Sequence, residues 1–119
     1  MTTLATLTGS EKQITWATEI RANFLQMADT LQTWLNQSPE AQADVDFVLL
    51  NTIIDTVRNA IATQTDSSWF IDNRRVNMIN GLPSLLPRKT LRKLEGNSDY
   101  ELAWMTMGTW NGYRAINMA

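Results

Sequence analysis

Residues 11 to 36 carry apolar side chains with the roughly 3.6-residue period of an α-helix, and this pattern constrains the fold more than any other sequence feature. The positions that share one arc of such a helix are Ala17, Ile20, Phe24, Met27, Ala28, Leu31 and Leu35. Ser10 stands where an N-cap residue is expected, and Gln13 can complete a capping box by bonding back to the Ser10 amide. The sequence therefore predicts a long helix over residues 11 to 36.

A second helix is predicted after a short break. Ser38 is a capping residue, and Pro39 suits the first helical position, where its missing amide hydrogen has no cost. We expect one helix from Pro39 to about Thr63, antiparallel to the first, with an apolar stripe formed by Phe47, Leu50, Ile53, Ile54, Val57, Ala60 and Ile61. Val45 and Val48 point away from this stripe, so we expect either the C-terminal segment or a second copy of the chain to cover them.

Three shorter helices are predicted in the second half of the chain. The first opens at a capping Asp66 and ends near residue 80, where Asn-Gly and then Leu-Pro follow. The second runs from Pro87 to residue 94, and the third spans residues 99 to 110 before an Asn-Gly stop. We therefore expect an all-α fold, in which two or three shorter helices pack against a long antiparallel helical hairpin in a single domain over residues 1 to 119.

Composition excludes most catalytic arrangements. The chain has no Cys and no His, so it has no thiolate nucleophile, disulfide, imidazole base or common zinc ligand. Its carboxylates are dispersed, and pairs such as Asp44 and Asp46 diverge on a helix. We expect no enzyme, metal site or cofactor. The longest aliphatic or aromatic run is residues 47 to 50, far short of the ~20 residues that cross a bilayer, so we expect a cytoplasmic protein without membrane contact.

Two stretches resemble a known pattern. Residues 9 to 21 carry Gly-Ser-Glu-Lys-Gln followed by Trp16, Ala17, Ile20 and Arg21, and residues 69 to 74 read Trp-Phe-Ile-Asp-Asn-Arg. Together they resemble the GSEKQ-x-x-WA-x-x-IR and W-x-IDNR motifs of small uncharacterised bacterial and phage helical proteins. The resemblance covers residues 9 to 75 and implies a bacterial host and a phage or mobile-element origin, with no assigned activity. Residues 76 to 119 would then be a C-terminal addition to this unit.

Residues 74 to 93 contain six of the ten basic residues and none of the twelve acidic ones. The six are Arg74, Arg75, Arg88, Lys89, Arg92 and Lys93. The last four repeat at a spacing of four residues, which places them on one helical face. Because the rest of the chain is acidic, we expect this segment to bind a partner. Three interpretations stay open: an acidic protein surface, nucleic acid, or a segment that is solvated or lies against the acidic body of its own chain or of a dimer mate.

The five Trp residues are the second candidate for binding, because Trp provides large contact areas and frequent interface hot spots. Trp16, Trp34 and Trp69 lie on or beside the apolar stripes, and we expect them in the core. Trp104 and Trp110 alternate with methionines in the C-terminal segment, and we expect them either in the core or at a partner or oligomer surface.

These features favour a non-enzymatic interaction protein that is encoded by a phage or mobile element. In this hypothesis it regulates or inhibits a host nucleic-acid-handling or defence complex, as an anti-CRISPR protein does, by protein–protein binding. One alternative is a nucleic-acid-binding protein that uses the basic face of residues 74 to 93. The other is a structural or assembly module, for instance a homodimer, that oligomerises through its Trp-rich tail.

Overall fold

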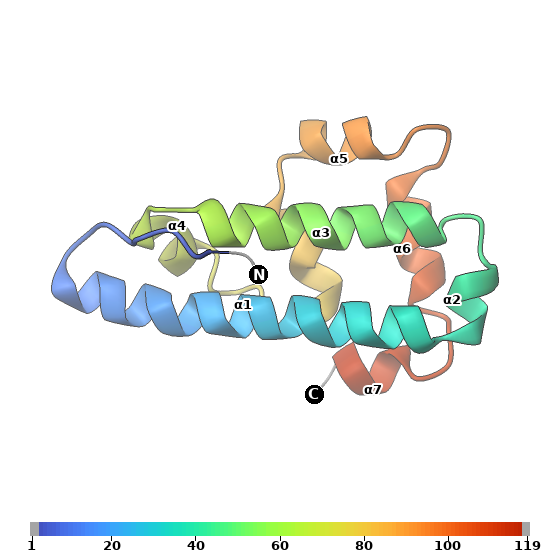
Figure 1. Ribbon diagram of the computed structural model, residues 1–119, viewed down its shortest axis with the longest axis horizontal. Coiled ribbons are helices and arrows are strands. Elements are labelled where there is room, and N and C mark those ends of the chain that lie inside the picture. Colours follow the sequence, from blue (N-terminus) through green and yellow to red (C-terminus); the bar gives the residue numbers. More distant parts are fainter. Residues whose placement is uncertain (1–2, 118–119) are drawn as a thin grey trace.

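The computed structural model describes residues 3–117, and every regular element in that range is a helix (Figure 1). The predicted all-α class is confirmed. The elements are α1 (Glu11–Gln37), α2 (Pro39–Ala43), α3 (Phe47–Thr63), α4 (Ser67–Asp72), the 3₁₀ helix η1 (Ile79–Leu85), α5 (Arg88–Leu94), α6 (Tyr100–Met107) and α7 (Tyr113–Asn117). Within residues 3–117, no helix combines the length and the apolar character that a bilayer crossing requires.

The long helix α1 follows the prediction closely at both ends. The Gln13 backbone N–H donates to Ser10 Oγ (3.2 Å), and the Ser10 N–H donates to Gln13 Oε1 (2.9 Å), so the capping box is present. Ser38 ends α1, and its hydroxyl oxygen accepts from the Ala41 N–H (3.3 Å) to cap α2. The buried residues of α1 all belong to the predicted stripe: Ala17, Ile20, Phe24, Ala28, Leu31 and Leu35.

Helices α1 and α3 lie side by side and antiparallel, as predicted (Figure 1). Apolar side chains fill the space between them, while partly exposed polar side chains bond across the seam. Arg58 on α3 donates to Asp29 (2.7 Å) and to Gln32 on α1, and Gln32 Nε2 donates to Asp55 (2.9 Å). Because these bonds join particular residues of the two helices, they favour one axial register of the hairpin.

The prediction of a single helix from Pro39 to Thr63 is wrong, because residues 44–46 separate α2 from α3. Asp44 Oδ1 accepts a hydrogen bond from the Asp46 N–H (2.8 Å), a local turn bond that competes with the helical bonding pattern. Val45 in this turn is 94% exposed and Val48 is 74% exposed. The C-terminal segment, as far as residue 117, therefore does not cover them, which corrects one of the two expected alternatives.

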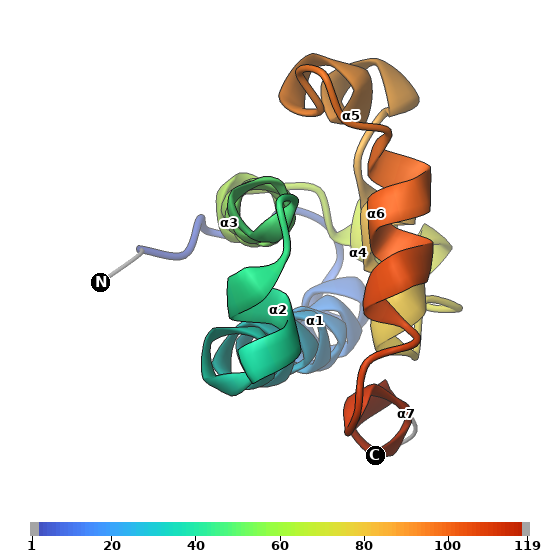
Figure 2. The same cartoon turned by 90° about the vertical axis from the view of Figure 1, so that its right-hand side faces the viewer.

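The second half of the chain forms a layer beside the α1–α3 hairpin, with α6 running across it and α5 and α7 at its two ends (Figure 2). The helix predicted from residue 66 to residue 80 is wrong, because α4 ends at Asp72. Arg74 Nη1 donates to Ile71 O (2.7 Å), a carbonyl that would accept from the Arg75 N–H in a longer helix, and Asn73 Nδ2 adds a side-chain bond to Trp69 O (2.8 Å) at the last turn. The predicted break at Leu-Pro is also wrong, since Pro83 lies inside η1.

The C-terminal helices are partly as predicted. Helix α5 begins after Pro87 as expected, and Asp99 caps α6 by accepting from the Glu101 N–H (2.9 Å). Helix α6 ends at Met107 rather than at residue 110. The chain then turns through Gly112, whose φ of 88° is in the region that favours glycine, and enters α7, which the sequence did not predict.

An extended N-terminal segment closes the end of the hairpin. The Ala5 N–H donates to Ala62 O (2.8 Å), and the Thr8 N–H donates to Thr65 O (2.7 Å). Gly9 connects this segment to α1 with a φ of 138°, and a Cβ there would lie 2.9 Å from Gln13 Oε1. Glycine is therefore required at this position by the backbone and by the capping box together.

Candidate functional site

The structure divides the basic segment into two groups. Arg74 and Arg75 lie in the turn after α4, whereas the other four cations lie on α5. Helices α4 and α5 are at different places on the molecule, because α4 packs near the first half of α1 and α5 lies over α3 (Figure 1). The six cations therefore form two separate surfaces rather than one.

Helix α5 presents nearly all of its length to solvent. Leu91 is its only buried residue, and Leu94 packs partly against the core. The side chains of Arg88, Lys89, Arg92 and Lys93 are exposed. Among the residues that the structure describes, Arg88 has one weak partner, Glu101 at 3.6 Å, and the other three cations have no ion pair within 4.0 Å. These four residues therefore form a cationic ridge on the surface, and three of them have no ion pair among the described residues.

The neighbouring acidic residues are committed to local backbone bonds. Glu95 accepts from the Tyr100 N–H (3.1 Å), and Asp99 accepts from the N–H groups of Glu101 (2.9 Å) and Leu102 (3.3 Å). These bonds hold the loop between α5 and α6 in place and fix the carboxylates of Glu95 and Asp99. With the Glu101 carboxylate, which pairs with Arg88, they line one surface hollow with Arg92, so the ridge has an acidic border on this side.

Arg74 is held against an aromatic ring. Its guanidinium lies over the Trp16 indole, 5.3 Å from the ring centroid, and its Nη1 donates to Ile71 O (2.7 Å). Trp16 is 45% exposed, so the expectation of a core position is wrong. The space beside Phe24 is filled by Trp69 and Phe70 of α4, whose rings lie 6.4 and 6.1 Å from that of Phe24.

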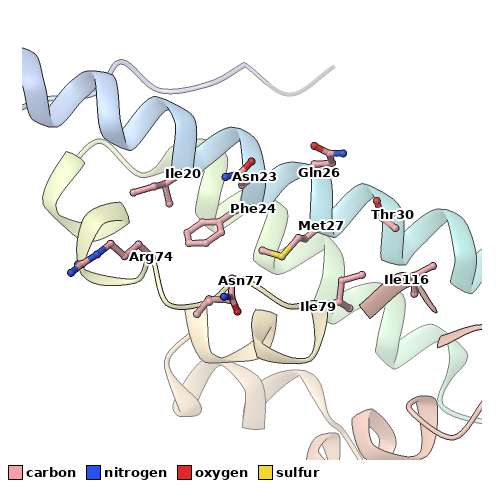
Figure 3. Close-up of a pocket in the computed structure, with 11 residues that line it drawn as sticks. Ile20, Asn23, Phe24, Gln26, Met27, Thr30, Arg74, Asn77, Ile79 and Ile116 are labelled. Atoms are coloured by element: carbon pink, nitrogen blue, oxygen red, sulfur yellow. The ribbon is translucent and has the colours of Figure 1, made fainter. Parts of the chain in front are cut away.

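A groove adjoins Arg74 and runs along α1 (Figure 3). Its volume is about 300 Å³. Phe24 and Met27 project from α1 toward Asn77 and Ile79 on the facing segment, and Asn23 and Thr30 lie along α1. The remaining lining residues are Ile20, Gln26, Arg74, Val76 and Ile116. The groove thus combines an apolar floor, amide side chains and one cation.

The sequence did not single out this groove. Met27 was placed on the apolar stripe of α1, and nothing connected it with Asn77, which is 50 positions later. The sequence feature closest to this surface was Trp16, which lies under Arg74. Its position at the edge of the apolar stripe is one where an aromatic ring is easily left outside the core.

The predicted aromatic site residues pack within the chain. Trp110 lies on Trp34 with ring centroids 6.3 Å apart, and Tyr113 packs on the same Trp34 at 5.6 Å. Trp34 Nε1 donates to Asn111 O (3.3 Å), which fixes the tail against α1. The indole nitrogen of Trp104 is buried, so this edge of its ring faces the interior. The large apolar side chains that α6 exposes are instead Leu102 (61%) and Met105 (71%).

The pKa is shifted from its ordinary value at Asp66 and at Tyr113. Hydrogen bonds from the Ser68 hydroxyl and backbone lower the pKa of the exposed Asp66 carboxyl, which caps α4. Burial raises the pKa of Tyr113 to about 12. Within residues 3–117, no three acidic side chains gather where they would hold a metal ion.

No protein-family model, curated protein or solved structure matches this chain.

Proposed function

We propose that this protein is a non-enzymatic interaction protein, and that α5 binds an acidic surface of a protein partner. The observation that carries the proposal is the cationic ridge of α5, three of whose four cations have no ion pair among the described residues. A second part of the proposal, a phage or mobile-element protein that inhibits a host nucleic-acid-handling or defence complex, is supported by the resemblance of residues 9 to 75 alone.

The geometry of α5 favours a protein partner over nucleic acid. Its seven residues span about 10 Å, which limits the number of phosphates it can reach at once. Glu95, Asp99 and Glu101 border the ridge and would repel a continuous phosphate backbone that extends past it. An acidic patch of limited area on a folded protein fits the same ridge without that penalty.

Charge reversal at Lys89 tests the proposal, with Lys12 as a matched control. Both are exposed lysines at the second position of a helix, α5 and α1 respectively, so Lys89→Glu and Lys12→Glu make the same change in net charge and in helix position. We expect affinity capture from a bacterial lysate to recover one protein with the wild type and with Lys12→Glu, but not with Lys89→Glu. Equal recovery with both variants would contradict a role for α5.

A nucleic-acid binding measurement distinguishes the proposed function from the main alternative, a nucleic-acid-binding protein. Fluorescence anisotropy with single- and double-stranded oligonucleotides is expected to show no binding at low salt. If the chain binds with an affinity that falls steeply as salt rises, and Lys89→Glu abolishes that binding, then α5 is a nucleic-acid surface and the protein-partner proposal is wrong.

A further inference from the structure

The groove beside Arg74 has the composition of a peptide-binding site rather than of an unfilled core. Its accessible apolar lining comes from the partly exposed Met27, Val76 and Ile116, whereas Phe24 and Ile79, which also line it, are only 1% and 2% exposed (Figure 3). Exposed side-chain amides line it from both sides, Asn23 on α1 and Asn77 on the facing segment. An amide side chain donates and accepts hydrogen bonds, so these residues match the alternating N–H and C=O groups of an extended backbone.

Arg74 supplies a prepared anchor for an anion at the Ile20 end of this groove, where its guanidinium points away from Phe24, Met27 and Asn77 (Figure 3). Stacking on Trp16 and the bond from Nη1 to Ile71 O fix the orientation of the guanidinium while using few of its five N–H donors. Neither Arg74 nor the adjacent exposed Arg75 has an ion pair among the described residues. A guanidinium that is already oriented loses little side-chain entropy when it binds a carboxylate.

The size of the groove sets the length of its occupant. From Ile20 to Thr30, the residues that line it on α1 are ten positions apart, which corresponds to about 15 Å along the helix. An extended peptide rises about 3.3 Å per residue, so four or five residues fill this length. The groove is only partly enclosed, which suits a chain that continues at both ends better than a small molecule that must be enclosed.

We propose that this groove binds an extended segment of a partner protein with one acidic and one apolar side chain, the carboxylate at Arg74 and the apolar group against the partly exposed Met27 and Ile116. The positive charge of Arg74, with the adjacent Arg75 beyond the groove, selects an acidic segment. This inference goes beyond the role of α5, because the groove shares no residue with that helix.

The test uses the full chain labelled with ¹⁵N and a panel of capped five-residue peptides. Each peptide carries one Glu and one Leu, at every spacing between them, in a background of Gly and Ser. We expect at least one spacing to shift the side-chain amide resonances of Asn23 and Asn77 and the indole resonance of Trp16. The matched peptides with Gln in place of Glu should bind about tenfold more weakly, because they lose a hydrogen-bonded charge pair.

Protein variants locate the binding. Arg74→Gln is expected to weaken the best peptide about tenfold, whereas Arg88→Gln on α5 should leave its affinity unchanged. Arg74 is exposed, and far-ultraviolet circular dichroism checks that the variant keeps its helices.

Three outcomes would overturn the inference. The first is a panel in which no peptide moves the groove resonances, and the second is a peptide whose binding Arg88→Gln abolishes and Arg74→Gln does not. The third is a shift of the same resonances by adenosine monophosphate or a short oligothymidylate with no response to any peptide, which would assign the groove to a nucleotide. The α5 proposal survives each of the three, because its readout is the capture of a protein that depends on Lys89.

Discussion

Replacing Trp110 by Ala distinguishes two roles for the C-terminal tail. The structure places the ring on Trp34, with Tyr113 on the same indole, and a hydrogen bond from Trp34 to Asn111 O closes this contact. In that arrangement Trp110 stabilises the single chain. In the alternative, in which the tail is an assembly surface, Trp110 stabilises contacts between copies.

The expected loss of stability follows from the burial of the ring. Trp110 is mostly buried, and a Trp side chain buries roughly 200 Å² when it is fully inside, so about 150 Å² is removed from water here. At about 25 cal/mol per Å² this burial contributes about 4 kcal/mol. The lost pairing with the Trp34 ring adds about 0.5 to 1.5 kcal/mol. Trp110→Ala should therefore lower the free energy of unfolding by about 4 to 5 kcal/mol.

Urea unfolding followed by far-ultraviolet circular dichroism measures this loss. With a denaturant dependence of about 2 kcal/mol per M, the midpoint should fall by about 2 M. Leu102→Ala is the control, because Leu102 is 61% exposed on α6 and its truncation should change the free energy of unfolding by less than about 0.5 kcal/mol. Light scattering at several protein concentrations should give the same mass for both variants and the wild type.

One result would refute the intramolecular reading of the tail. If Trp110→Ala leaves the urea midpoint within the range of the Leu102→Ala control and at the same time converts an oligomer to a monomer, then the ring acts between copies, and the assembly alternative is correct.

Two further predictions concern local features. Ser10→Ala removes the acceptor of the capping bond and should lower the free energy of unfolding by about 1 kcal/mol. The melting temperature should then fall by about 4 °C, and an unchanged calorimetric transition would contradict a stabilising role of the capping box. Burial raises the pKa of Tyr113 from 10.0 to about 12, so the unfolded chain loses this proton first. The urea midpoint should therefore fall as pH rises from about 10 to about 12. Tyr113→Phe should make the urea midpoint depend less on pH in this range. An equally steep dependence in the variant would exclude Tyr113 as the cause.

The elements that could be predicted are those with local signals at both ends. Helix α1 has a capping box, an unbroken apolar period and a following Ser-Pro, and α5 has a Pro start and a short apolar contact through Leu91. The break before α3 was missed because apolar spacing continues through it. Its signal was the Asp44 side chain, whose bond to the Asp46 N–H replaces helical bonding at one position.

The candidate sites depended on contacts that no local pattern contains. The groove forms only because residues 74–79 return to α1, which requires α4 to end at Asp72 and the chain to turn there. Trp16 and Trp34 have similar positions relative to the apolar stripe, yet one is exposed under Arg74 and the other is covered by the tail. Whether each ring is exposed or covered depends on which distant segment packs on it, and the spacing of residues in the sequence carries no information about that packing.

The separation of the cations follows from the packing between them. The chain that joins Arg75 to Arg88 is anchored by Ile79, Leu82, Leu85 and Leu86, all of which are buried. Bringing the two cationic groups together would expose these four side chains, at a cost of about 1.5 to 3 kcal/mol for each. The four costs together approach the whole free energy of unfolding of a domain of this size. A contiguous charge cluster in the sequence is therefore two fixed surfaces in the folded protein. A partner that engages both must carry two acidic sites at a matching separation. In that case Arg74→Gln and Lys89→Glu would each weaken the same complex, whereas two independent ligands would each respond to only one of the variants.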